Sequence, residues 1–159
     1  MSAVLVACSH GTRSPAGREV VRRLVAALRS LDPTLDVRQA FVDVEEPRVP
    51  DVVRDVLRED AGRTVVVVPL LLSVGVHARH DIGAAVEVGR DGAAVAAGTL
   101  GPDPRLVTVL QERLVEAGVR PQDAVVLAAA GSSDPAAADD VEVVRAALQA
   151  RRPGPVTVG

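Results

Sequence analysis

Two of the three histidines follow short apolar runs that are typical of buried strands. His10 comes shortly after the run over residues 3–8, and His77 follows the uniformly apolar run over residues 64–70. Neutral imidazole is a ligand that suits divalent cobalt, nickel, iron and zinc. If both histidines lie at neighbouring strand ends, they predict a site for a divalent transition metal. The alternative is that each imidazole only hydrogen-bonds the backbone of its own loop.

Carboxylates follow the second expected strand. Asp43, Glu45 and Glu46 lie within four residues of each other. Carboxylates at such a position can accept protons or supplement a metal site, and the alternative is an ordinary solvated acidic loop. Pro47 restricts Glu46 to extended backbone geometry, which favours a fixed carboxylate at that residue.

Arginines flank the same segments. Arg13, Arg48 and Arg79 each lie within three residues of a candidate histidine or carboxylate. The planar guanidinium group suits carboxylate recognition, and the amides at the start of the first expected helix also favour anions. These groups predict a site for an acidic ligand, with ordinary surface arginine as the alternative. His80 lies three residues after His77, and we expect it to face solvent.

The elements that must position these residues alternate between strand and helix. Strands are expected over residues 3–8, 36–42, 64–70, 93–97, 124–129 and 155–158, and helices over residues 14–30, 50–60, 81–90, 104–117 and 135–150. This order predicts an α/β fold with a doubly wound parallel sheet, a Rossmann-like layer. In the usual order of such sheets the first and third strands are neighbours, and ligands bind beyond their carboxyl ends. His10 and His77 should therefore emerge side by side.

The pattern restarts after Gly118 at an offset of 120 residues. The matching pairs include Gly11 with Gly131, Pro15 with Pro135 and Leu28 with Leu148. We therefore expect a complete α/β unit over residues 1–118 and the start of a second, incomplete repeat over residues 119–159. His10 is replaced by Ala130 in the repeat, so any metal site belongs to the first unit. The unfinished sheet predicts a shortened chain, or a chain that completes its sheet as a homodimer.

Composition excludes several classes of function. The 159 residues are 48% hydrophobic and 25% charged, which is typical of a globular domain. Phe41 is the single aromatic residue and the net charge is −3, so we expect no nucleic-acid partner. The longest apolar run, residues 65–72, is too short for a membrane span. A lone cysteine, Cys8, fits a reducing cytoplasm, and no phosphate-binding glycine motif predicts a nucleotide.

Four segments, in order, resemble the CbiX/SirB family of sirohydrochlorin chelatases. They are residues 9–13 (SHGTR), 41–47 (FVDVEEP), 68–82 (VPLLLSVGVHARHDI) and 100–103 (LGPD). The resemblance covers residues 3–118 and implies an ATP-independent enzyme that inserts Co²⁺ or Fe²⁺ into sirohydrochlorin, toward cobalamin or sirohaem. The metal is a substrate and no nucleotide is required. The family fold implies two similar α/β halves with the macrocycle bound between them.

The resemblance also implies roles for particular residues. The two metal-site histidines of the family fall on His10 and His77, which are therefore also the first catalytic candidates. The family usually has Glu where this chain has Asp43, so Asp43 and Glu46 are both candidates for the catalytic carboxylate. The candidate residues for binding the carboxylates of sirohydrochlorin are Ser9, Thr12, Arg13 and Arg79.

Two other functions are compatible with the same residues. A non-catalytic protein could bind the metal or the tetrapyrrole without turnover. A histidine phosphatase would place an Arg-His-Gly motif after its first strand, but Ser9 stands at the position of that arginine. Imidazole ligation admits cobalt, iron and nickel alike.

Overall fold

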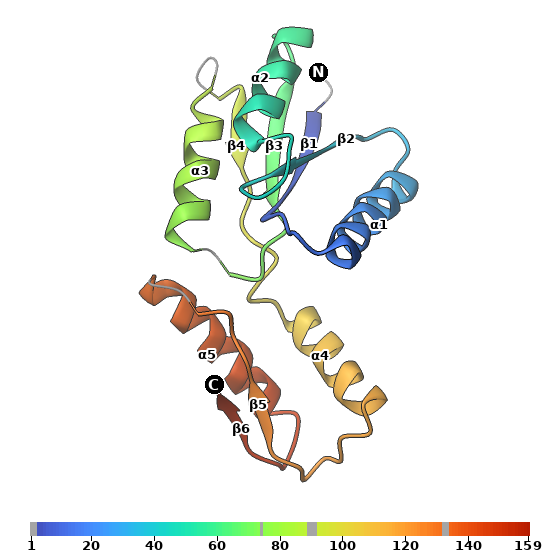
Figure 1. The fold of residues 1–159 in the computed structure, drawn as a ribbon, viewed down its shortest axis with the longest axis vertical. Coiled ribbons are helices and arrows are strands. Elements are labelled where there is room, and N and C mark those ends of the chain that lie inside the picture. The colour runs from blue at the N-terminus through green and yellow to red at the C-terminus, as the bar shows by residue number, and fades with distance from the viewer. Residues whose placement is uncertain (1–2, 74, 89–91, 132–133) are drawn as a thin grey trace. The chain divides into compact units, whose positions relative to one another are not determined.

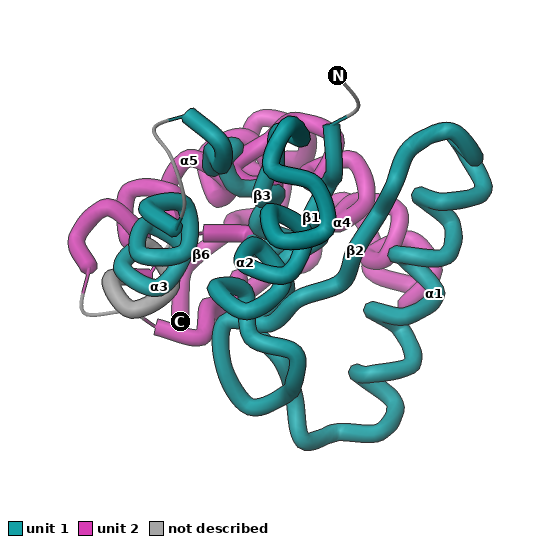
Figure 2. The backbone as a smooth tube through the Cα atoms, turned by 90° about the horizontal axis from the view of Figure 1, so that it is seen from above, with its two compact units in different colours: residues 1–71, 76–99 teal, residues 72–75, 100–159 magenta. Residues whose placement is uncertain are grey.

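The computed structural model divides the chain into two compact units (Figure 2). The described residues are 3–73, 75–88, 92–131 and 134–159, with the backbone alone for residues 76–79. The first unit comprises Met1–Leu71 and Val76–Thr99, and the second comprises Leu72–Gly75 and Leu100–Gly159.

A four-stranded parallel sheet forms the centre of the first unit (Figure 1). Its strands are β1 (Ala3–Ser9), β2 (Asp36–Phe41), β3 (Thr64–Pro69) and β4 (Ala94–Ala96). They lie in the order β2-β1-β3-β4. β1 pairs in parallel with β3 from Ala3 opposite Thr64 to Cys8 opposite Pro69. The expectation that the first and third strands are neighbours is confirmed, and their carboxyl ends share one edge of the sheet.

Helices cover both faces of this sheet, as the doubly wound prediction requires. They are α1 (Pro15–Leu31) on one face and α2 (Val49–Glu59) with α3 (Val76–Val86) on the other (Figure 1). Because side chains alternate along a strand, β1 contributes to two cores. Val6 and Cys8 pack with residues of α2, whereas Ala7 packs with Val25 of α1. No helix in the described part of the chain is long and apolar enough to cross a bilayer.

The start of α3 corrects the sequence-based expectation. A helix was expected over residues 81–90, but α3 begins at Val76, so His77 lies in its first turn. Among the described side chains of this helix, the buried apolar residues are Ile82 and Ala85, which lie in its second half. The expected helix over residues 81–90 includes both of them. The expected end near Arg90 lies outside the described residues.

The second unit packs two helices against a pair of parallel strands. Its elements are α4 (Pro104–Glu116), β5 (Val125–Leu127), α5 (Pro135–Gln149) and β6 (Val156–Val158). Val107 of α4 shares a core with Leu148 of α5 and Val156 of β6. α4 therefore belongs by packing to the second unit. The predicted boundary after residue 118 marks the place where the sequence pattern restarts, and it stays a prediction.

Backbone features of the β1–α1 segment recur at the expected offset. Gly11 and Gly131 both have positive φ, 92° and 78°. Each precedes a helix that begins with proline behind a capping side chain, Ser14 in α1 and Asp134 in α5. Ser and Asp are favoured caps because a side-chain oxygen accepts a hydrogen bond from a free amide of the first turn. The recurrence agrees with an internal repeat of this segment.

Candidate metal and substrate site

His10 lies directly beyond β1 with its side chain exposed. Its backbone is tied to the loop that follows β2. The amide of Asp43 donates to the carbonyl of His10 at 2.9 Å, and the amide of Val42 donates to the carbonyl of Ser9 at 2.9 Å. These bonds extend the β1–β2 pairing past the ends of the strands. The imidazole is thus presented at the carboxyl edge of the sheet on a backbone that is held in place.

Gly11 allows this close approach of the two loops. It adopts φ 92°, a conformation that L side chains rarely take. A Cβ atom on Gly11 would also overlap the carbonyl oxygen of Asp43. The glycine next to His10 is therefore required both by backbone geometry and by space.

Asp43 is an exposed anion beside His10. Its Oδ1 accepts hydrogen bonds from the amide of Val44 at 2.7 Å and from Nη1 of Arg48 at 2.9 Å. The hydrogen bond from Val44 is the main cause of a lowered pKa for Asp43; the bond from Arg48 contributes next, and the nearby His10 adds a smaller effect. The carboxylate therefore stays ionised to a lower pH than an ordinary aspartate. That property suits attraction of a cation better than acceptance of protons.

Arg48 is engaged within its own loop. Besides Asp43, it pairs through Nε with Glu46 at 3.1 Å and donates to the carbonyl of Val42 at 2.9 Å. These contacts leave Arg48 less suited to ligand recognition than the sequence suggested. Glu46 itself is 71% exposed in its side chain, so it is accessible to a substrate.

The candidate substrate-binding residues of the β1–α1 loop differ in accessibility. Ser9 is only 5% exposed, and its Oγ has no hydrogen-bond partner among the described residues. The hydroxyl of Thr12 accepts a hydrogen bond from the amide of Ser14 at 3.1 Å. Arg13 is exposed, and no ion pair joins it to a carboxylate of the described residues. Arg13 is therefore the member of this group that is best placed to meet an acidic ligand.

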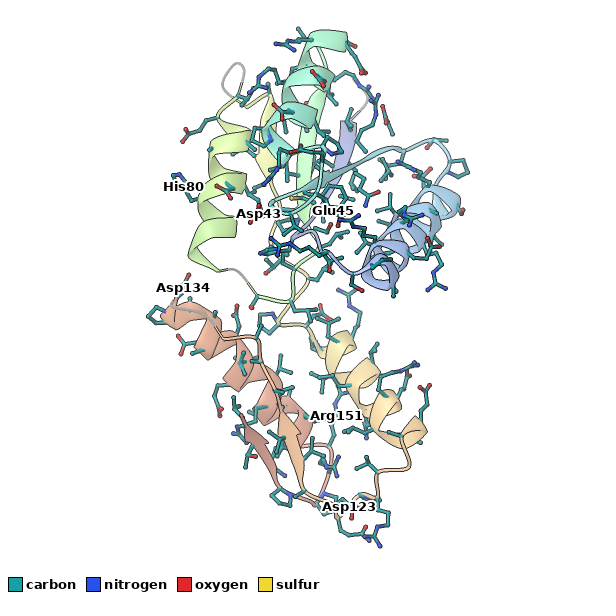
Figure 3. The ribbon with its side chains drawn as sticks, viewed as in Figure 1. Asp43, Glu45, His80, Asp123, Asp134 and Arg151 are labelled. Carbon is teal, nitrogen blue, oxygen red and sulfur yellow. The ribbon has the colours of Figure 1, made fainter. Side chains whose placement is uncertain are left out.

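The second histidine enters from the neighbouring strand. His77 lies in the first turn of α3, which follows β3, and β3 is paired with β1. The side chains of His77 and Arg79 lie outside the described residues. His80 is exposed on α3, as expected (Figure 3). Among the side chains that are described, no group of three or more His, Cys, Asp and Glu residues could hold a metal ion.

Cys8 precedes the last residue of β1 and is fully buried. Desolvation by burial is the main cause that raises its pKa to about 12, and the charge of Asp81 adds to the effect. A thiol with this pKa is protonated at neutral pH and is a poor metal ligand. Cys8 is therefore a buried thiol of the core and not a candidate ligand.

We expect alkylation of Cys8 by iodoacetamide at pH 8 to be about a thousandfold slower in the folded chain than in urea, because the thiolate fraction falls tenfold per pKa unit. Since the folded pKa is raised, ionisation favours the unfolded state as pH rises above the ordinary thiol value of 9.0. Stability should therefore decline in that range. Mass spectrometry of quenched samples measures the rate, and equal rates in both states would contradict this account.

One carboxylate was underestimated from the sequence. Glu45 belongs to the acidic cluster, yet Asp43 and Glu46 were preferred as site residues. Figure 3 labels Asp43 and Glu45 in the same region of the first unit. The side chain of Glu45 is only 14% exposed and accepts a hydrogen bond from the amide of Thr12 at 2.8 Å. No spacing in the sequence marks which of three neighbouring acidic residues turns inward.

These features define an open α/β protein in which His10 and the ionised Asp43 lie in loops at the carboxyl edge of the parallel sheet. A family model described as CbiX matches residues 4–117. The chain therefore belongs to the CbiX family.

Named relatives are similar over much of the chain. The sirohydrochlorin ferrochelatase of Priestia megaterium is 30% identical over 160 residues, which cover 95% of this chain and 58% of that protein. The sirohydrochlorin cobaltochelatase of Sulfolobus acidocaldarius is 28% identical over 109 residues, 68% of this chain and 86% of the relative. The structure of SirB from Bacillus subtilis with Fe³⁺ matches with a TM-score of 0.84 and 25% identity, over 99% of this chain and 65% of SirB. The chain thus spans less than two thirds of the Priestia relative and of SirB.

Proposed function

We propose that this chain is a sirohydrochlorin chelatase, which inserts Co²⁺ or Fe²⁺ into the macrocycle. The observation that carries the proposal is the parallel pairing of β1 with β3, because it brings the backbone segments that bear His10 and His77 to one edge of the sheet. The relatives named as ferrochelatase and cobaltochelatase support the substrate and both metals.

In the proposed mechanism, neutral imidazoles of His10 and His77 hold the incoming divalent ion. A few imidazole ligands bind more weakly than the four converging nitrogens of the macrocycle, so the ion passes to the ring without nucleotide hydrolysis. Asp43 is ionised beside His10, and its charge draws the cation to this edge. The metal is the substrate of this reaction and is consumed with each turnover.

Insertion also releases two protons from the pyrrole nitrogens. The lowered pKa of Asp43 makes it a weaker base than an ordinary aspartate. Glu46 is exposed three residues further along the same loop, and we assign proton acceptance to Glu46. The carboxylates of sirohydrochlorin are proposed to meet Arg13 and Arg79, whose guanidinium groups suit such partners. The lone cysteine fits a cytoplasmic location.

The residue at position 9 argues against the histidine phosphatase alternative. A phosphate clamp would need a cationic side chain before His10, and Ser9 is small and buried there. The carrier alternative keeps the same metal ligands but lacks turnover, so a kinetic measurement separates it from the chelatase.

The test is incubation of the purified chain with sirohydrochlorin and Co²⁺ or Fe²⁺ without oxygen, followed by the absorbance change of the macrocycle. We expect a rate above the spontaneous one that rises in proportion to protein concentration, with more than one turnover per chain. Binding of Co²⁺ without turnover would favour the carrier. A rate equal to the spontaneous reaction, with no Co²⁺ bound, would overturn both assignments.

A further inference from the structure

The carboxylate of Glu45 lies between the loop that bears His10 and the loop that follows β2. Its Oε1 accepts a hydrogen bond from the amide of Thr12 at 2.8 Å, and its Oε2 pairs with Nε of Arg18 at 3.2 Å. The side chain of Glu45 is 14% exposed. Burial of this kind strengthens a charge-assisted hydrogen bond, because water competes less for the carboxylate.

Arg18 and Glu45 together hold the backbone of Thr12, and these two residues are called the Thr12 clamp. The same Nε that faces Glu45 also donates to the carbonyl of Thr12 at 2.9 Å. Both backbone polar groups of Thr12 are thus held, its amide by Glu45 and its carbonyl by Arg18. Arg18 is anchored in turn by its place in the first turns of α1.

The clamp acts two residues away from the imidazole. His10 is separated from Thr12 only by Gly11, whose backbone has the widest conformational freedom of any residue. The amide of Asp43 fixes the carbonyl of His10 on one side of this glycine, and the clamp fixes Thr12 on the other. Without Glu45, the segment that follows His10 would lose a long-range anchor and would leave the amide of Thr12 to water.

Glu45 differs in this respect from its acidic neighbours. The side chains of Asp43 and Glu46 are 62% and 71% exposed, and both pair with Arg48 of their own loop. Glu45 instead accepts a hydrogen bond from Thr12, which is 33 residues away in the sequence. Two of the three carboxylates therefore face solvent, and the third connects two loops within the first unit.

We propose that Glu45 is a positioning residue for the metal ligand His10: it holds Thr12 and so fixes the backbone from which the imidazole meets the ion. This inference rests on the proposed function in that it assigns metal binding to His10. Glu45 itself neither touches the metal nor accepts the pyrrole protons.

The test measures Co²⁺ binding in the absence of the macrocycle, through the paramagnetic broadening of the His10 ring signals. Loss of an outer-shell partner commonly weakens metal affinity by 10- to 100-fold, so Glu45→Ala should lower the Co²⁺ affinity about tenfold. Glu45→Gln keeps an oxygen that can accept from Thr12 and should recover most of that loss. Glu19→Gln, at an exposed glutamate paired with Arg22 on α1, is the matched control and should bind as the unaltered chain does.

All measurements are made well below the melting temperature of each variant, so that a purely structural role would lower Tm without altering the Co²⁺ affinity. Unchanged affinity in folded Glu45→Ala would overturn the proposal. Equal loss in Glu45→Gln and Glu45→Ala would also count against positioning through Thr12. If the unaltered chain binds Co²⁺ at His10 but inserts none, the chelatase assignment fails while the role of Glu45 is still decided by the affinities.

Discussion

His10→Ala is expected to reduce Co²⁺ insertion at least about a hundredfold. Loss of an outer-shell partner alone can cost a metal site that much, and this substitution removes a proposed ligand itself. The side chain is exposed at the end of β1, so the free energy of unfolding should change by less than about 0.5 kcal/mol. The rate of the macrocycle absorbance change, corrected for spontaneous insertion, measures the first effect, and urea unfolding measures the second.

His80→Ala is the matched control, because His80 is an exposed histidine on the element that also bears His77. It should insert Co²⁺ at the rate of the unaltered chain. His77→Ala should resemble His10→Ala if both imidazoles hold the ion. Full activity in either His10→Ala or His77→Ala would reject the proposed metal site.

Gly11→Ala is expected to damage both stability and metal binding. A non-glycine residue in a left-handed conformation costs about 1–2 kcal/mol, and Gly11 has φ 92°. The added methyl would also overlap the carbonyl of Asp43. Such overpacking commonly costs roughly a further 1–3 kcal/mol. We therefore expect a loss of about 3 kcal/mol in the free energy of unfolding, together with weaker Co²⁺ binding as the two loops separate.

Gly131→Ala separates the two causes. Gly131 is the repeat counterpart, with φ 78°, but no atom of the other described residues lies within 4 Å of the place where its Cβ would stand. This variant should lose only the conformational cost, about 1–2 kcal/mol, and should keep its Co²⁺ affinity. Denaturant unfolding and metal titration of both variants provide the comparison. Equal losses in both would show that contact with Asp43 has no role.

Much of the fold was predictable because burial leaves a repeated pattern along the chain. β3 reads as a continuous apolar run because helices and neighbouring strands enclose it, and α1 begins at the expected Ser14–Pro15 signal. The neighbouring placement of β1 and β3 followed from the alternation of strands and helices, since right-handed crossovers leave few topologies. The order of the motifs was enough to suggest the CbiX family.

The candidate site was predictable only in outline. His10 could be assigned to the end of β1 from the sequence, because a strand end is a local feature. The different roles of Asp43, Glu45 and Glu46 could not, because all three have the same chemistry and nearly the same position. Their separation depends on Val44, whose φ of 67° turns the chain between the first two.

The sequence by itself thus determined the strands, the helices, their order and the edge at which His10 emerges. Only the tertiary structure decided that α3 begins at Val76, that α4 packs with the second unit, and that Glu45 turns inward to Thr12. The physical reason is the range of the interactions. Periodic burial acts between residues a few positions apart, whereas a contact such as Glu45 with Thr12 forms only after distant loops are brought together by the sheet.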